Sequence, residues 1–217
     1  MKYFFTFLLV FSFSISFAQQ TKIDSLQSEF QKSTSEEKII TIQEQLFQEY
    51  LTTKDVAYIH NYLNTLLTNN KIKSNTKLKA LVYKLKGNLY AGESKYDSSI
   101  KKYKKGLQLI KNIDSNKIAG DIYLNISSRL KEKGEIDSVL YYSKKAEKIY
   151  LNINNYRGLC FLHYNKAVNY LATDDFSECE YHLNKLLFYN KFYKNAYFDG
   201  QSHYLFGVFN SLLNNFK

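Results

Sequence analysis

The chain has 217 residues, with no proline or tryptophan, eight glycines and two cysteines. This composition favours helix and disfavours sheet and long turns, so we expect an all-α fold. The formal net charge of +10 would suit nucleic acid, but the lysines alternate with aromatic and acidic residues along expected helices. We therefore expect no nucleic-acid partner.

The first eighteen residues have the pattern of a secretory signal peptide. Lys2 precedes an apolar and hydroxyl-bearing run over residues 3–17, and the small side chains of Ser16 and Ala18 suit cleavage after Ala18. The run is shorter than the roughly 20 residues that a membrane-spanning helix needs, although an uncleaved anchor is an alternative. No later run reaches that length, so we expect an exported mature chain without a membrane span, in the periplasm, with secretion or the cell surface as alternatives.

A forty-residue internal period organises the rest of the chain. Shifting the sequence by this period aligns a column of small residues, Gly87, Ser127, Ala167 and Gly207. Three residues later it aligns a column of larger residues, Tyr50, Tyr90, Leu130 and Tyr170. Because such columns keep their register over several units, the chain is predicted to consist of structural repeats.

Each unit carries two apolar stripes at helical spacing, separated by a short polar break, which predicts a helical hairpin. The breaks lie at residues 92–95, 133–135 and 173–175. The small residue of each first helix allows close approach of the second helix, which offers a slim residue such as Ser99 or Cys179 at that level. Ser94, Asp97 and Ser98 predict N-cap chemistry at the start of one second helix, and Asp137 and Ser138 predict it at another.

These patterns predict three regions in chain order. Residues 1–18 are the signal peptide, and residues 19–39 are an N-terminal capping helix region with Ile23, Leu26 and Phe30 on one face. Residues 40–217 hold the repeats, at about 40–79, 80–119, 120–159 and 160–199, followed by a partial unit at 200–217. One hairpin cannot bury its apolar face alone, so stacking of neighbours is expected to form a continuous core.

The segments YKLKGNLY, KYDSSIKKYKKGL and KGEIDSVLYYSKKAEKI resemble tetratricopeptide repeats (TPR). The resemblance implies an α-α superhelix, a solenoid of antiparallel helix hairpins. It also implies a non-enzymatic protein that binds another protein or a peptide in a concave groove lined by the first helices. The period of forty exceeds the family's roughly 34 residues, which we ascribe to longer second helices and linkers such as residues 110–116.

The same resemblance predicts which side chains line the peptide-binding groove. They are Leu81, Lys84 and Asn88, then Asp121, Leu124 and Asn125, then Phe161, Tyr164, Asn165 and Val168, with Tyr204 and Val208 beyond them. This surface grades from polar to aromatic and suits an extended peptide or a partner helix. Lys84, Asn88 and Asn125 also match part of the carboxylate clamp of heat-shock cochaperones, but such residues occur in repeats without a clamp too.

The cysteines and histidines are expected to have structural roles. Cys160 and Cys179 are expected as buried free thiols, because their levels in the hairpin do not face each other. His163 and His203 occupy equivalent repeat positions and could converge on a metal, but packing is the expected role. The chain has no nucleophile motif, phosphate-binding glycine loop or metal-ligand spacing, so we expect no enzymatic activity, no cofactor and no metal site.

The apolar segment over residues 203–213 allows three interpretations. It docks on the preceding repeat, it mediates self-association, or the chain is a truncated piece of a longer protein. A signal peptide before forty-residue repeats is similar to the N-terminal sensory half of membrane-anchored regulators in Bacteroidota-type bacteria. The alternative function is therefore the sensory fragment of a transcriptional regulator or histidine kinase.

Overall fold

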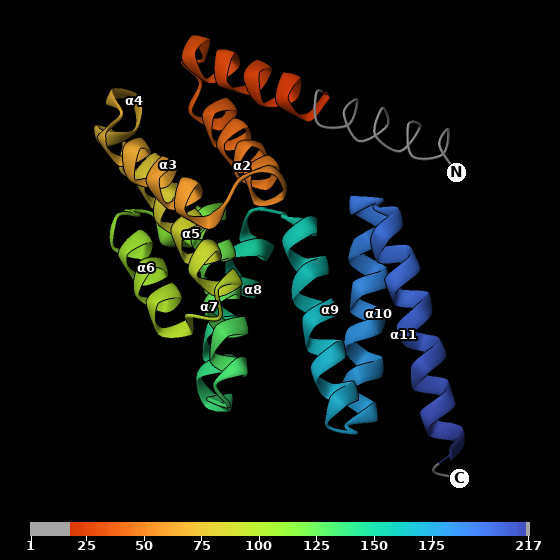
Figure 1. The fold of residues 1–217 in the computed structure, drawn as a ribbon. Coiled ribbons are helices and arrows are strands. Elements are labelled where there is room, and N and C mark those ends of the chain that lie inside the picture. The colour runs from red at the N-terminus through yellow and green to blue at the C-terminus, as the bar shows by residue number, and fades with distance from the viewer. Residues whose placement is uncertain (1–17, 216–217) are drawn as a thin grey trace, which may run out of the picture. The chain divides into compact units, whose positions relative to one another are not determined.

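The computed structural model describes residues 18–215 (Figure 1). Within this range the backbone forms α-helices, one short 3-10 helix and no strand, which confirms the expected all-α class. The predicted signal peptide, apart from Ala18, lies outside the described residues. None of the helices in the described range is both long and apolar enough to cross a bilayer.

The described chain divides into two compact units, with the boundary between Leu109 and Ile110. In the first unit, residues 18–32 are helical and are followed by α2 (Glu36–Thr53), α3 (Val56–Thr68), α4 (Asn70–Lys73), α5 (Thr76–Gly92) and α6 (Tyr96–Gln108). Helix α5 packs against α2, α3, α4 and α6. It is therefore the central helix of this unit.

The second unit contains two helix pairs and a final helix. Its elements are η1 (Ile113–Ser115), α7 (Lys117–Glu132), α8 (Ile136–Asn152), α9 (Tyr156–Ala172), α10 (Phe176–Tyr193) and α11 (Ala196–Asn215). The pairs α7/α8 and α9/α10 are the hairpins predicted from the period, and α8 packs against α9. Figure 1 shows α9, α10 and α11 running side by side.

Three of the described turns that join a first helix to its second helix, those of α5–α6, α7–α8 and α9–α10, share one geometry; the turn between α2 and α3 differs, since Lys54 has φ of -124°. The left-handed residues Ser94, Gly134 and Asp174, which have φ of 58°, 75° and 56°, are spaced forty residues apart. The amide after each of them donates to a carbonyl five residues earlier, that of Tyr90, Leu130 or Tyr170, at 2.9–3.0 Å. This is the Schellman arrangement that ends a helix.

The N-cap prediction is wrong for both second helices for which it was made, α6 and α8. The residues before α6 and α8, Lys95 and Glu135, make no side-chain cap bond. Acidic side chains do cap α3 and α10, where Asp55 accepts from the backbone amide of Tyr58 and Asp175 accepts from that of Glu178. The reason is that the end of the first helix determines the turn. Ser94 adopts the left-handed conformation there, so its side chain does not cap the second helix.

The small-residue column has the predicted packing role in three repeats. A Cβ built on Gly87 would lie 2.3 Å from the buried ring of Tyr103, and the Ser99 hydroxyl donates to the Gly87 carbonyl at 2.8 Å. The Ser127 hydroxyl likewise donates to the Val139 carbonyl at 3.1 Å. Ala167 and Cys179 are fully buried in one apolar cluster. Only Gly207 on α11 has open space around it.

The two ends of the described chain are docked on their neighbours. Ile23, Leu26 and Phe30 are buried, as predicted for a capping helix. The Lys71 ammonium donates to three carbonyl groups at the end of that helix, those of residues 30, 31 and 33, at 2.5–3.0 Å. At the other end, α11 buries Phe198, Leu205 and Phe209 against α9 and α10. Docking on the preceding repeat is thus the interpretation that the structure supports for α11.

We predict opposite effects of alanine at two glycines of the small column. Gly87→Ala should lower the free energy of unfolding by about 1–3 kcal/mol, because the new methyl group displaces the Tyr103 ring. Gly207→Ala should raise it by about 0.5–1 kcal/mol, because its surroundings are open and alanine favours helix. Urea denaturation followed by circular dichroism measures both, and equal effects at the two sites would contradict the close-approach argument.

Candidate functional site

The residues predicted to line the groove divide between the two units. Leu81, Lys84 and Asn88 lie on α5 in the first unit. The others lie on α7 and α9 in the second unit, and the sequence extension of the groove, Tyr204 and Val208, lies on α11. Helix α9 packs against both α7 and α11.

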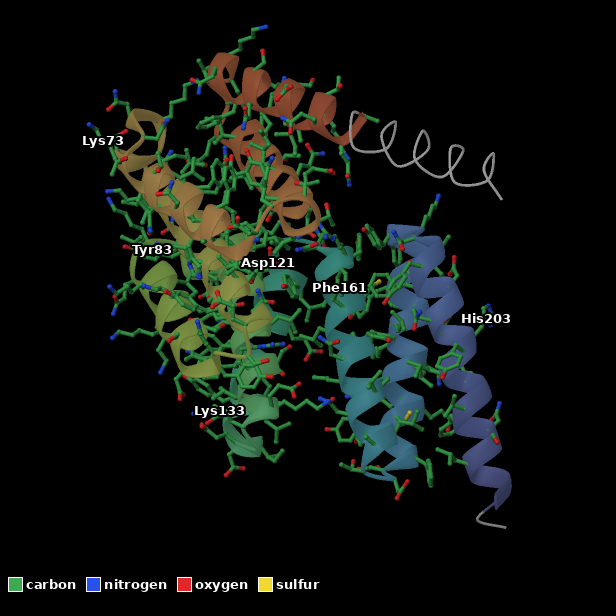
Figure 2. The ribbon with its side chains drawn as sticks, viewed as in Figure 1. Lys73, Tyr83, Asp121, Lys133, Phe161 and His203 are labelled. Carbon is green, nitrogen blue, oxygen red and sulfur yellow. The ribbon has the colours of Figure 1, made fainter. Side chains whose placement is uncertain are left out.

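Helices α9 and α11 present a continuous group of aromatic rings, here called the aromatic surface. It consists of Phe161, Tyr164 and Tyr197, whose rings contact the buried ring of Phe198, and of Tyr204, which is close enough to Tyr164 to affect its pKa. Phe161, Tyr197 and Tyr204 expose 37%, 54% and 67% of their surface. Figure 2 shows Phe161 on α9. The Phe161 and Phe198 rings meet edge to face, with centroids 4.8 Å apart.

Polar groups between the rings are oriented by the same two helices. The Tyr164 hydroxyl donates to the Gln201 side-chain oxygen at 3.1 Å, which joins α9 to α11. Burial raises the pKa of Tyr164, and the phenols of Tyr197 and Tyr204 raise it further, so this hydroxyl keeps its proton. Asn165 is half-buried, and its side chain makes no hydrogen bond to the part of the chain that the structure describes. Its amide can therefore donate to and accept from a ligand.

The remaining predicted residues of this unit have mixed roles. Val168 is half-buried against the core cluster of Ala167 and Cys179, and Leu124 and Asn125 are half-buried on α7. Asp121 accepts from the hydroxyl of Tyr150 at 2.9 Å and pairs with Lys117 at 3.2 Å. Its carboxylate therefore holds the α7–α8 hairpin together.

The prediction for α5 is wrong at Leu81 and needs correction at Lys84. Leu81 is 0% exposed, because α5 is covered by α2, α3 and α6, so it belongs to the core. Lys84 is buried and its ammonium pairs with Glu44. The Asn88 side-chain oxygen accepts from the Tyr103 hydroxyl at 2.7 Å. The two α5 groups that resemble a carboxylate clamp are thus already bonded within their own unit.

Sequence reasoning missed Tyr197, Phe198 and Gln201 on α11. The internal period could have identified Gln201, since the forty-residue shift that relates Tyr164 to Tyr204 also relates Phe161 to Gln201. Arg157 was missed as well, and its guanidinium lies 5.7 Å from the centre of the Phe161 ring. An open hollow of about 690 Å³, lined by residues 111–115 and by α7 and α8, contains none of the predicted groove residues.

The cysteines are buried and free, as predicted. Cys179 lies in the cluster with Leu183 and Leu205, whereas Cys160 packs with Leu186 and Phe198. Burial raises the pKa of the Cys160 thiol to about 12 and also raises that of Cys179. Both are therefore protonated apolar side chains at neutral pH rather than nucleophiles.

The two histidines at equivalent repeat positions do not converge, so the structure does not support the alternative of a shared metal. His163 does not approach His203, which is exposed on the outer side of α11 (Figure 2). Instead, the Nδ1 atoms of His163 and His182 lie 3.0 Å apart and share one hydrogen bond in the core. Tyr189 stacks on His163 and Tyr170 stacks on His182. The packing role is thus confirmed for His163, with a partner on α10 that one repeat of sequence does not reveal.

Charged groups border this histidine pair without forming a metal site. Glu147 lies 3.6 Å from Nε2 of His163, and Glu178 lies 3.7 Å from Nε2 of His182. Burial lowers the pKa of His163 to about 3, with further lowering by His182, Lys166 and Lys185. Burial also lowers the pKa of His182 to about 4. Within the described residues, no three histidine, cysteine or acidic side chains are placed to hold a metal.

This pair predicts an acid-dependent loss of stability. In the unfolded chain the two histidines bind protons below pH about 6.5, whereas in the folded chain they stay neutral down to about pH 4. The free energy of unfolding is therefore independent of the pair's titration above pH 6.5, and it decreases as the pH falls toward 4 because the unfolded chain then binds more protons. The expected slope is about 1.4 kcal/mol per pH unit for each histidine.

Urea denaturation at pH 5, 6 and 7 tests this slope. His163→Gln should reduce the slope by about half, since one of the two histidines no longer titrates. The matched variant His203→Gln changes an exposed histidine and should leave the slope as in the unaltered chain. An unchanged slope in His163→Gln would show that the pair does not remain neutral in the folded protein.

Comparison with known proteins bears on the fold. No protein-family model matches the sequence, and no curated protein matches it. Among solved structures, the chain is similar to BtubC (BKLC) from P. vanneervenii, with a TM-score of 0.65 and 11% sequence identity. The match covers 93% of this chain and 90% of that chain. At this identity the likeness concerns the fold alone, and it agrees with an all-α arrangement of consecutive helix pairs.

Proposed function

We propose that the protein is an exported, non-enzymatic interaction protein of the tetratricopeptide-repeat type. It binds an extended peptide, or an extended segment of a partner protein, on the aromatic surface of α9 and α11. One observation supports this proposal most directly. Phe161, Tyr197 and Tyr204 remain exposed on the same two helices that hold the Asn165 side-chain amide, which has no hydrogen-bond partner among the described residues. The partner is therefore expected to bring apolar or aromatic side chains.

The chemistry of these groups supports peptide binding. Phe and Tyr rings bury a large area and lose few rotatable bonds on binding, which makes them effective anchors. The amides of Asn165 and Gln201 lie among the rings and supply the paired donors and acceptors that an extended backbone requires. The packing beneath them is rigid, because Phe198 is buried between α9, α10 and α11.

The repeat geometry supports the family part of the proposal. The helix pairs, the left-handed turn residues and the small contact residues all recur at forty-residue intervals in the described chain. In a solenoid of this type the first helices of successive pairs line one surface. Helices α7, α9 and α11 are the first helices of the second unit, and α9 packs against both of the others.

Selection from a phage-displayed peptide library on the mature chain tests this proposal. For a selected peptide, Phe161→Ala and Tyr204→Ala should each weaken binding about tenfold or more, as expected for aromatic anchors. Fluorescence polarisation with the labelled peptide measures the affinity. Tyr204 is the best exposed of these rings, so its removal costs the fold little.

Tyr181→Ala is the matched control for these variants. Tyr181 is an aromatic residue of α10 with 52% of its surface exposed, and it is not part of the aromatic surface. Its removal should leave the affinity unchanged. Equal binding by all three variants, or loss only with Tyr181→Ala, would place the peptide elsewhere and reject the proposal.

A further inference from the structure

The positive charge of the first unit is concentrated on one part of it. Residues 56–109 contain eleven lysines and two acidic residues, Glu93 and Asp97. Helices α3 and α5 contain no acidic residue, and Asp97 is the one acidic residue of α6. Exposed lysines on these helices are hydrated, but a buried one finds few acidic partners in its own segment.

Lys86 on α5 is the most informative of these lysines. It is 7% exposed, and its ammonium donates to the Asn64 side-chain oxygen on α3. Among the described residues it has no carboxylate partner, in contrast to Lys84, which pairs with Glu44. An ammonium has three hydrogens to donate, and a buried charge is costly unless it is compensated. Lys86 therefore lacks a negative partner among residues 18–215.

Two further cations lie on the same side of α5. Tyr90 follows Lys86 by one helical turn, and the Lys102 ammonium lies 5.6 Å from the centre of the Tyr90 ring. Lys105 follows Lys102 by one turn on α6. Burial lowers the pKa of Lys86, and the charges of Lys102 and Lys105 lower it further, in keeping with their closeness. Neither Lys102 nor Lys105 pairs with a carboxylate in the described part of the chain.

Glu93, the acidic residue nearest to Lys86 in sequence, does not neutralise Lys86. Glu93 follows the end of α5, and its carboxylate binds Nε2 of His60 at 2.6 Å and the Lys95 ammonium at 2.5 Å. Those two contacts lower the pKa of Glu93, with Lys95 as the larger cause. Its charge is therefore already engaged by its own partners.

We propose that Lys86, Lys102 and Lys105, with the side-chain amide of Asn64, bind a compact oxyanion of the phosphate type. The anion is either inorganic phosphate or the phosphate group of a small ester. Three ammonium groups from two helices match its negative charge, and Asn64 can donate through its NH₂ while its oxygen holds Lys86. This oxyanion site lies on α3, α5 and α6, in the unit that does not contain the aromatic surface, and so it does not depend on the proposed function.

Thermal unfolding in phosphate and in chloride tests the site. At equal ionic strength and pH, a phosphate concentration about tenfold above Kd should raise Tm by roughly 3 °C, because the ligand binds the folded chain alone. Isothermal titration calorimetry with inorganic phosphate measures Kd directly. Titration with glycerol 3-phosphate separates the two sources, since a site for an ester binds it more tightly than the free ion.

Three variants distinguish this site from general attraction to a basic surface. Lys86→Met keeps the apolar stem and should abolish the phosphate-dependent rise in Tm. The double variant Lys102→Gln with Lys105→Gln changes positions outside the core and should weaken phosphate binding at least tenfold, even if Lys86→Met fails to fold. Lys104→Gln removes an exposed charge from the same helix and should retain the rise.

Two results would overturn the proposal. One is an equal Tm of the unaltered chain in phosphate and in chloride at matched ionic strength. The other is equal loss of phosphate binding in Lys104→Gln and in the double variant, which would show that total charge alone attracts the ion.

Discussion

The close approach of paired helices is the constraint on which the other features depend. In the second unit, the ring of Tyr150 fills the space that a side chain would take at two glycines. A Cβ on Gly120 or Gly158 would lie 2.6–2.7 Å from that ring. Tyr150 thereby joins α8 both to α7 and to the next first helix, α9, and its hydroxyl is held by Asp121. The first unit uses the same device with Gly87 and Tyr103.

This tight packing determines which side chains remain for binding. Bulky rings such as Phe198 and Tyr150 fill the spaces between helices, whereas Phe161, Tyr197 and Tyr204 lie above a floor that is already filled. A ring held over a rigid floor loses little freedom when a partner covers it, which favours its use as an anchor. The fold therefore supplies preorganised aromatic groups without a deep cavity.

The two kinds of buried basic side chain differ because their ordinary pKa values differ. Burial opposes the charged form of both, but histidine ionises near neutral pH and lysine about four units higher. The His163–His182 pair can therefore become neutral and pack among Tyr170 and Tyr189. The pKa of Lys86 is lowered by burial from a much higher ordinary value, and the described residues offer its ammonium an amide oxygen but no carboxylate. The same physical effect thus gives a packing element in one unit and a candidate ligand site in the other.

The sequence alone determined the helices, their pairing and the contact levels between them, because period and small-residue columns reflect interactions within one hairpin. It predicted Gly87, Ser127 and Ala167 as contact residues between paired helices. It also predicted that Phe161 and Tyr164 lie on one surface of α9, and the structure shows that both contact α11. Only the tertiary structure decided that Leu81 is a core residue and that His163 pairs with His182. The covering of a helix face depends on how many other helices pack against it, and α5 has neighbours on several sides. The number of helices that pack against α5 is a property of the assembled chain, and it cannot be read from the pattern of residues within α5.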